Sequence, residues 1–274
     1  MAAPKRPWAR PAPRPASPST QRRPAGSMSK PAPKTSSSMP GRRVWRSSRL
    51  TVDVYYMHAP DRRLPVKETL SGLNELYKQG AFKRLGLSQY LGEEVEEIIR
   101  VAKENNFVVP SVYQGNYSAI ARRAEAEIFP IIRKHNMSFY AYSPIAGGFL
   151  AKSKAALTES NGRFGEGQPL AQVYNGMYNR PSFVAALDVW EDLAKAENTT
   201  RAELAYRWIA YHSKLAGDQG DAIVVGARNM QQFGETLQAL KAGPLSDAAV
   251  AKIDQVWDSV KADAFLDNYE MLSR

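Results

Sequence analysis

Four polar residues stand at the ends of four short apolar runs, and they are the part of this 274-residue sequence that could do chemistry. They are His58, Ser88, Gln114 and Ser143. In folds built from parallel strands and helices, binding and catalytic groups lie at the carboxyl ends of the strands. An imidazole, two hydroxyls and a carboxamide at one such edge can hold a polar ligand by hydrogen bonds. The spacing therefore predicts one ligand site formed by several separate strands.

A fifth apolar run offers a second kind of chemistry, the binding of a phosphate group. The run AIVVGAR ends with Gly226, Ala227 and Arg228, and Asn229 then begins a helix-like segment. The start of a helix presents free backbone N–H groups and the positive end of the helix dipole. Parallel barrels often bind phosphate at this place, after their last two strands. An ordinary capped surface helix has the same pattern, so both interpretations stay open at this point.

Short strands that alternate with amphipathic helices must position these residues. Strands are predicted at 52–58, 85–89, 108–116, 137–144 and 222–228. Helices are predicted at 65–80, 93–105, 124–135, 182–197, 200–215, 229–240 and 246–260, with a long loop at 147–181. Pro130 is expected to interrupt the helix at 124–135. Thr200 and Asn229 are placed to cap the helices that follow them. The alternation predicts an α/β fold with about five βα units around a parallel sheet.

Charge divides the chain into two parts. Residues 1–50 hold twelve Lys and Arg, no Asp or Glu, and ten of the 18 prolines, which predicts a disordered basic tail. The remaining part, 51–274, is nearly neutral, so we expect neither nucleic acid nor a membrane surface as its partner. Three interpretations of the tail stay open. It could be a mitochondrial transit peptide, a basic arm, or a non-homologous start joined to a real domain.

Composition also excludes several kinds of site. The chain has no cysteine, which excludes disulfides, thiol catalysis and metal ligation by cysteine. His135 and His212 are far from His58 in the sequence, so we expect no metal site. No apolar run approaches the roughly 20 residues of a membrane span. A cytoplasmic protein is therefore expected, or a mitochondrial one if the tail is a transit peptide.

Several segments in series resemble the aldo-keto reductases, in particular the branch of the aflatoxin aldehyde reductases and their fungal relatives. These segments are VDVYYMHAPDR, GLSQY, PSVYQGNYSA, FYAYSPIAGGFLAK, GRF, AELAYRWIAYHS, GDAIVVGARNMQQFGETL and GPLSDAAV, and they extend roughly from Thr51 to Tyr269. The resemblance implies a (β/α)8 barrel that uses NADPH to reduce a small aldehyde or ketone. Nothing before Leu50 supplies the three further strands of such a barrel, so we expect residues 51–274 to form an incomplete one.

The resemblance also implies catalytic roles. His58 matches the histidine that orients and polarises the carbonyl group. The family's Asp, Tyr and Lys, which supply the proton, have no counterpart, because no Asp, Glu or Tyr precedes Asp53. We therefore expect impaired activity. The alternatives are a non-catalytic NADP(H)-binding or regulatory protein, or a truncated product without function. Two unpaired strand edges would make such a chain poorly soluble unless it forms a homodimer.

Residues that contact the cofactor are better preserved in the resemblance. It places Ser88 and Gln114 on the nicotinamide carboxamide, with Gln89 where the family usually has Asn. Tyr142 either stacks on the nicotinamide ring or belongs to the core. The segment Ser143–Lys152, with Ile145 and Gly147, would wrap the pyrophosphate.

The far end of the cofactor is assigned in the same way. Arg163 would make a further contact, Gly226 would contact the cofactor at the last strand-to-helix turn, and Arg228 would hold the adenosine 2′-phosphate. Gln232, Glu235 and Thr236 would lie toward the adenine. The resemblance assigns Tyr174 to the carbonyl substrate.

Overall fold

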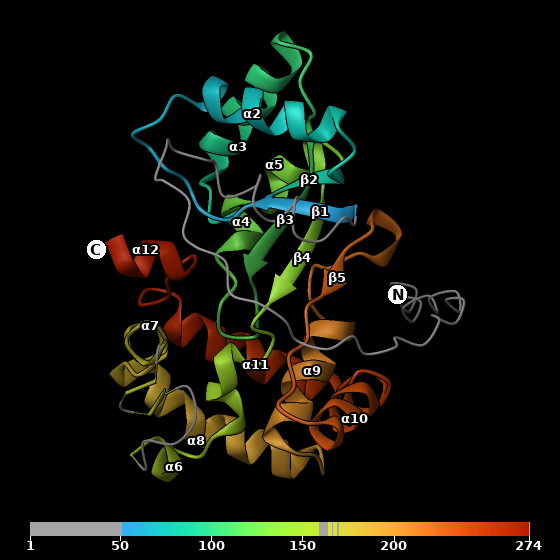
Figure 1. Ribbon diagram of the computed structural model, residues 1–274. Helices are drawn as coiled ribbons and strands as arrows, with labels where there is room; N and C mark the ends of the chain where they lie inside the picture. The colour runs from blue at the N-terminus through green and yellow to red at the C-terminus, as the bar shows by residue number, and fades with distance from the viewer. Residues whose placement is uncertain (1–50, 159–163, 166, 169, 274) are drawn as a thin grey trace, which may run out of the picture.

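Five strands form one parallel sheet in the computed structural model, which describes residues 51–158, 164, 165, 167, 168 and 170–273. The strands are β1 (Val52–Met57), β2 (Phe82–Ser88), β3 (Pro110–Asn116), β4 (Ser138–Tyr142) and β5 (Ala222–Ile223). They lie side by side in sequence order (Figure 1). Every pairing is parallel, so the carboxyl ends of the strands share one edge. The predicted α/β fold is confirmed.

The register of the strands brings the predicted polar residues together. Ser88 at the end of β2 pairs with Gln114 of β3. Met57 pairs with Leu87, so His58 follows β1 beside the end of β2. In the described sheet β1 and β5 are the outer strands. Such outer strands leave backbone groups unpaired on one side.

The helices of the first βα units cover one side of this sheet. They are α2 (Val66–Lys78), α3 (Gly92–Glu104), α4 (Ala124–Glu127) and α5 (Phe129–Lys134) (Figure 1). Each of the two long helices buries an apolar stripe, such as Leu70 and Leu73 in α2. The helix predicted at 124–135, with an interruption at Pro130, is observed as two helices, and the interruption lies at Ile128 between α4 and α5. Pro130 then lies in the first turn of α5, where a helix does not need its N–H group.

The long loop predicted at 147–181 is also wrong. The described part of this segment contains a 3-10 helix, η1 (Ala146–Ala151), and the helices α6 (Lys154–Thr158) and α7 (Ala171–Tyr178). Helix α7 buries the residues Val173, Tyr174, Met177 and Tyr178. Two of them stack in an aromatic cluster with Phe149 of η1. The Gly, Ser, Asn and Gln around these positions hid the helical spacing in the sequence.

A second group of helices lies beyond β4 and β5. It consists of α8 (Pro181–Ala196), α9 (Arg201–Tyr211), α10 (Met230–Ala239), α11 (Asp247–Val260) and the short α12 (Asn268–Ser273) (Figure 1). Both predicted caps are confirmed. The Thr200 hydroxyl accepts the N–H of Glu203, and the Asn229 carboxamide accepts the N–H of Gln232. These caps satisfy N–H groups that have no partner inside the helix.

Strand β5 is shorter than the predicted 222–228. It ends at Ile223, and the N–H of Val224 makes one further bond to the carbonyl of Ala141, at 2.8 Å. The chain then leaves the sheet, so Gly226 and Arg228 lie in an extended turn before α10. A short 3-10 helix, η3 (Gly217–Gln219), precedes β5. The early end of the strand leaves this turn free to line a cavity.

One buried carboxylate fixes β4, α5 and the segment before β5. The side chain of Asp221 is fully buried and pairs with the guanidinium of Arg133. It also accepts the backbone N–H groups of Phe139, at 2.7 Å, and Ala216, at 2.8 Å. Several hydrogen bonds to one buried charge offset the cost of removing it from water. Asp221 therefore holds the final strand in register with β4.

Candidate functional site

A cavity of about 810 Å³ opens at the carboxyl ends of the strands. Thirteen of the sixteen predicted site residues line it. They are His58, Ser88, Gln89, Gln114, Tyr142, Ser143, Ile145, Gly147, Lys152, Tyr174, Gly226, Arg228 and Gln232. Residues separated by more than a hundred positions in the sequence thus share one wall. The fold brings together nearly the whole set that the sequence predicted.

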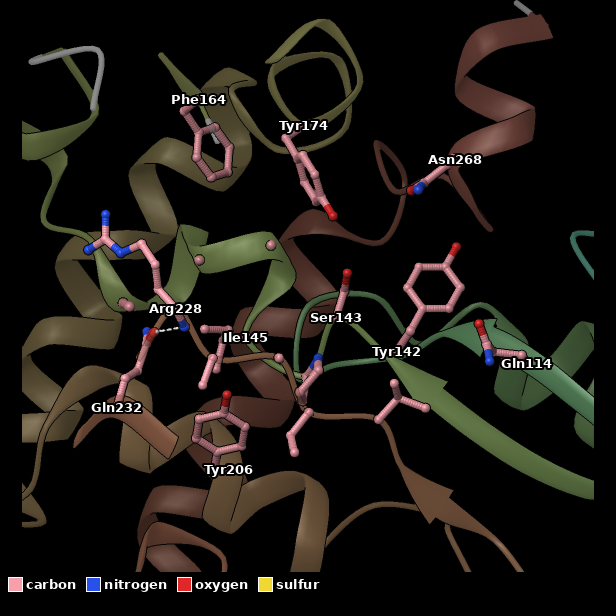
Figure 2. A pocket seen from close by; sticks show the side chains of 18 of the residues that line it. Gln114, Tyr142, Ser143, Ile145, Phe164, Tyr174, Tyr206, Arg228, Gln232 and Asn268 are labelled. Carbon is pink, nitrogen blue, oxygen red and sulfur yellow. Dashed lines mark hydrogen bonds between the residues drawn. The ribbon is translucent and has the colours of Figure 1, made fainter. Parts of the chain in front are cut away.

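Polar groups and one ring form the end of the cavity beside β2, β3 and β4. Ser88 is buried at 3% exposure, and Gln114 and Tyr142 are partly buried. Figure 2 shows Gln114 beside Tyr142, with Ser143 next along the wall. Burial raises the pKa of the Tyr142 hydroxyl well above its ordinary value, so the side chain stays neutral. A hydroxyl, a carboxamide and a neutral ring suit a flat, polar aromatic group.

His58 and Gln89 occupy the rim of this end. The His58 side chain is exposed, and Gln89 donates a hydrogen bond from Nε2 to the backbone carbonyl of His58 at 2.9 Å. Gln89 has a left-handed backbone, with φ of 65°. Within the described residues the His58 imidazole makes no hydrogen bond or ion pair. It is free to meet a ligand that enters the cavity.

The middle of the cavity is formed by the turn after β4 and by α7. Gly147 has φ of 67°, and a Cβ atom placed on it would lie 2.1 Å from the Tyr174 ring. Only a residue without a side chain permits both this backbone and this contact. Phe164 packs against Tyr174 with ring centroids 5.9 Å apart. Figure 2 shows Phe164 and Tyr174 above the row formed by Ser143 and Ile145.

Arg228 and Gln232 form the opposite end of the cavity. The Gln232 carboxamide oxygen accepts the backbone N–H of Arg228 at 2.8 Å, drawn as a dashed line in Figure 2. The Arg228 side chain is exposed and pairs with no carboxylate of the described chain. An unpaired guanidinium near the start of α10 gives this end a positive potential. This arrangement can hold an anionic group such as a phosphate.

Two of the predicted site residues that the structure describes do not line the cavity. Glu235 and Thr236 lie one turn further along α10 and do not line the cavity, and their predicted place toward the adenine stays a prediction. The Thr236 hydroxyl bonds back to the carbonyl of Gln232 at 2.9 Å, and Glu235 pairs with Gln231. Arg163 lies outside the described residues.

The cavity also contains residues that the sequence did not predict. Among them are Phe164, Tyr206 of α9 and Asn268 of α12. Figure 2 shows Tyr206 approaching from the side opposite to Tyr174. Tyr206 is only 4% exposed, in a helix whose apolar stripe reads as ordinary core. Tyr206 reaches the cavity because α9 packs against η1. No local pattern in the sequence indicates this contact between distant segments.

The described residues carry neither of two other common functional features. Among them, no three side chains of the types that ligate metals lie together. No helix in the described part of the chain is long and apolar enough to cross a membrane.

Comparison with known proteins identifies the class that this sheet and cavity define. The profile of the Aldo/keto reductase family matches residues 46–258. An oxidoreductase, sirO, from Leptosphaeria maculans is 38% identical over 78% of this chain and 65% of its own length. An aldo-keto reductase from Pseudocercospora fijiensis is 39% identical over 77% of this chain and 72% of its own length. Aflatoxin B1 aldehyde reductase member 2 from Mus musculus is 38% identical over 76% of this chain and 59% of its own length.

The chain therefore belongs to the aldo/keto reductase family. The fold of this family is a (β/α)8 barrel, and the described residues supply five of its parallel strands. The chain spans 65% of the sirO protein and 59% of the mouse reductase.

Proposed function

We propose that this chain binds NADP(H) as an aldo-keto reductase does, and that its reduction of aldehydes and ketones is impaired. One observation carries the proposal. The cavity of about 810 Å³ joins polar, neutral groups at one end to the free guanidinium of Arg228 at the other. A dinucleotide with a flat amide-bearing ring and an extra phosphate has the same division of polarity. Cavities of several hundred cubic ångströms are the usual size for such ligands.

The residues present fit the three parts of this cofactor. Ser88 and Gln114 offer a hydroxyl and a carboxamide for the nicotinamide amide, beside the Tyr142 ring. The turn from Ser143 to Lys152 would lie along the pyrophosphate, and its left-handed Gly147 leaves room for the Tyr174 ring that packs against it. Arg228 offers a charge-assisted hydrogen bond to a 2′-phosphate. The position of Arg228 supports the proposed preference for NADPH over NADH.

The chemistry of the bound cofactor is to supply a hydride to the carbonyl carbon. The chain's own groups would act on the carbonyl oxygen and on the shape of the site. His58 stands at the rim with a free imidazole, in a position to donate a hydrogen bond to that oxygen and polarise the bond. Tyr174 and Phe164 cover the middle of the cavity and would exclude water from it.

Proton transfer is the step that this chain supports poorly. Reduction of a carbonyl needs a proton on the developing alkoxide, and a positioned acid accelerates that transfer by roughly a hundredfold to ten-thousandfold. The family assigns this task to a tyrosine tuned by a lysine and an aspartate, and the 274-residue sequence has no counterpart of these three. We therefore expect cofactor binding with slow turnover. A non-catalytic NADP(H)-binding role is the second candidate. It is favoured by the same two observations, a cavity that fits the cofactor and the lack of a counterpart for the proton-donating residues.

A reductase assay on the full 274-residue chain separates these outcomes. Consumption of NADPH would be followed by the absorbance of the reduced nicotinamide, with an aromatic aldehyde as substrate and His58→Ala as the matched variant. Slow turnover that falls further in His58→Ala supports an impaired reductase. Binding with no turnover supports the non-catalytic role, and the absence of binding overturns the proposal. A rate typical of enzymes, with kcat above about 1 per second, contradicts the impairment.

A further inference from the structure

Two neighbouring side chains at the end of β2 hold the backbone that carries His58. Gln89 donates from Nε2 to the carbonyl of His58 at 2.9 Å. The hydroxyl of Tyr90 donates to the next carbonyl, that of Ala59, at 3.3 Å. Strand β1 has already ended at Met57, where its last register pair with Leu87 lies. These two bonds therefore continue the connection between the strands after the backbone ladder has stopped.

The support behind this pair reaches into the core. Tyr113 of β3 is 2% exposed, and its hydroxyl donates to the backbone carbonyl of Tyr90 at 2.7 Å. Burial raises the pKa of Tyr90 to about 12, so its hydroxyl keeps its proton and remains a donor at neutral pH. Three strands thus contribute to the position of one peptide segment.

The imidazole of His58 has no comparable support of its own. Within the described chain it makes no hydrogen bond or ion pair, and the side chain is exposed. Its direction therefore depends on the backbone from which it extends. A change of about an ångström in such a group can cost a hundredfold in rate. The groups that fix the His58 carbonyl consequently decide where the imidazole meets a ligand.

We propose that Gln89 and Tyr90 are positioning residues for His58. They act through the backbone carbonyls of His58 and Ala59 rather than by contact with the reacting atoms. This inference rests on the proposed function, because only a bound carbonyl substrate beside the nicotinamide gives the His58 imidazole an oxygen to contact. The length of Gln89 matters here. Its carboxamide extends across the gap between two strand ends, and its left-handed backbone, with φ of 65°, directs it there.

Nuclear magnetic resonance can test this directly, because the sequence contains only three histidines. The full chain would be compared with Gln89→Leu, which keeps the bulk and removes the donor, and with Tyr90→Phe, which removes one hydroxyl that does not line the cavity. Gln231→Leu is the matched control, since it removes an exposed glutamine carboxamide from α10. The measurements are backbone ¹⁵N order parameters without cofactor and the imidazole shifts of all three histidines upon NADPH addition.

The expected result is specific to one segment. Order parameters of His58 and Ala59 should fall from about 0.85 toward 0.6 in Gln89→Leu and less far in Tyr90→Phe. The response of the His58 imidazole to NADPH should be lost in Gln89→Leu, while His135 and His212 remain unchanged. Gln231→Leu should match the parent chain in every measurement.

Three other results are distinguishable from one another. If order parameters in Gln89→Leu stay at those of the parent chain, the positioning role is wrong even when NADPH binds. If the order parameters fall as expected but neither the parent chain nor any variant responds to NADPH, the proposed function is wrong. The conclusion that Gln89 and Tyr90 hold the His58 backbone then still stands. General loosening, with order parameters falling equally in β3 and β4, also overturns the positioning role, because the two hydrogen bonds would then only stabilise the fold.

Discussion

The carboxamide oxygen of Gln232 accepts the backbone N–H of Arg228 at 2.8 Å, and this bond closes the turn before α10. Asn229 caps the same helix by accepting the N–H of Gln232. The turn is thus held by two side chains, while the guanidinium of Arg228 is left without a carboxylate partner in the described chain. The fold fixes the backbone at this end of the cavity and leaves its charge available to a ligand.

Arg228→Ala should separate the two nicotinamide cofactors. Loss of one charge-assisted hydrogen bond costs about 1.5–3 kcal/mol, so the Kd for NADPH should rise roughly tenfold to a hundredfold. The Kd for NADH should change little, because NADH lacks the 2′-phosphate. Isothermal titration of both cofactors measures the difference. Lys252→Ala, which removes an exposed cation from α11, should leave both affinities unchanged. An equal loss for NADPH and NADH would show that Arg228 does not read the phosphate.

Two adjacent glycines give a matched pair of substitutions. Gly147 and Gly148 both have positive φ, at 67° and 106°, so an alanine at either is strained by about 1–3 kcal/mol. Only at Gly147 does a new Cβ meet the Tyr174 ring, and Gly148 has open space. Gly147→Ala should therefore weaken NADPH binding at least about tenfold more than Gly148→Ala, while both lower the melting temperature. Equal binding by the two variants would refute the role assigned to this wall.

Asp221→Asn should strongly destabilise the fold. The substitution leaves Arg133 without its charge partner beside a fully buried side chain. Breaking such a pair from one side typically costs about 3–5 kcal/mol. Urea unfolding followed by circular dichroism measures the change. Asp258→Asn, at an exposed residue of α11 whose carboxylate pairs with Lys261, should change the free energy of unfolding by less than about 1 kcal/mol. If Asp221→Asn lowers the free energy of unfolding as little as Asp258→Asn does, Asp221 does not hold β5 in register with β4.

Asp267 makes the stability of the fold depend on pH, and the direction of this dependence can be stated. Burial raises the pKa of its carboxyl above the ordinary value, so the folded state binds this proton more tightly than the unfolded state. Its contribution to stability is therefore fully present below the unfolded pKa of about 4 and is lost as the pH rises through the folded pKa.

Asp267→Asn tests that sign. Asparagine keeps the acceptor that the N–H of Glu270 uses, at 2.9 Å, and removes the buried charge. The variant should melt at a higher temperature than the parent chain at pH 7. The difference should disappear near pH 3, where the parent carboxyl is protonated in both states. A variant that is less stable at pH 7 would show that the carboxylate is favourably paired.

The sequence was most informative where local patterns and strand ends coincide. The spacing of apolar residues and the residues that begin or end an element predicted the five strands and both caps. A buried parallel strand and a capped helix each have a recognisable local sequence pattern. Ser88 and Gln114 could be placed in one site from the sequence, since parallel strands present their ends at one edge. The family's motifs then assigned residues such as Gly147 and Arg228, which line the same cavity.

Features that depend on packing between distant segments could not be predicted in this way. The sequence of α7 predicts a loop because Gly and Asn interrupt its apolar stripe, and the packing of its tyrosines on Phe149 and Phe164 shows which face is buried. The placement of β5 beside β4 depends on the bonds of Asp221 to Arg133 and Phe139, which lie far away in the sequence. The hydrogen bond from Gln89 to His58 spans 31 positions and has no periodic signature.

Titration of the full 274-residue chain with NADPH tests the central claim most directly. The fluorescence of the buried residues Trp190 and Trp208 reports binding, and a thermal melt in parallel reports its effect on stability. We expect saturable binding and a melting temperature that rises with NADPH, since a ligand that binds only the folded state stabilises it. A chain that shows no saturation and no shift in its melting temperature would contradict the assignment of the cavity.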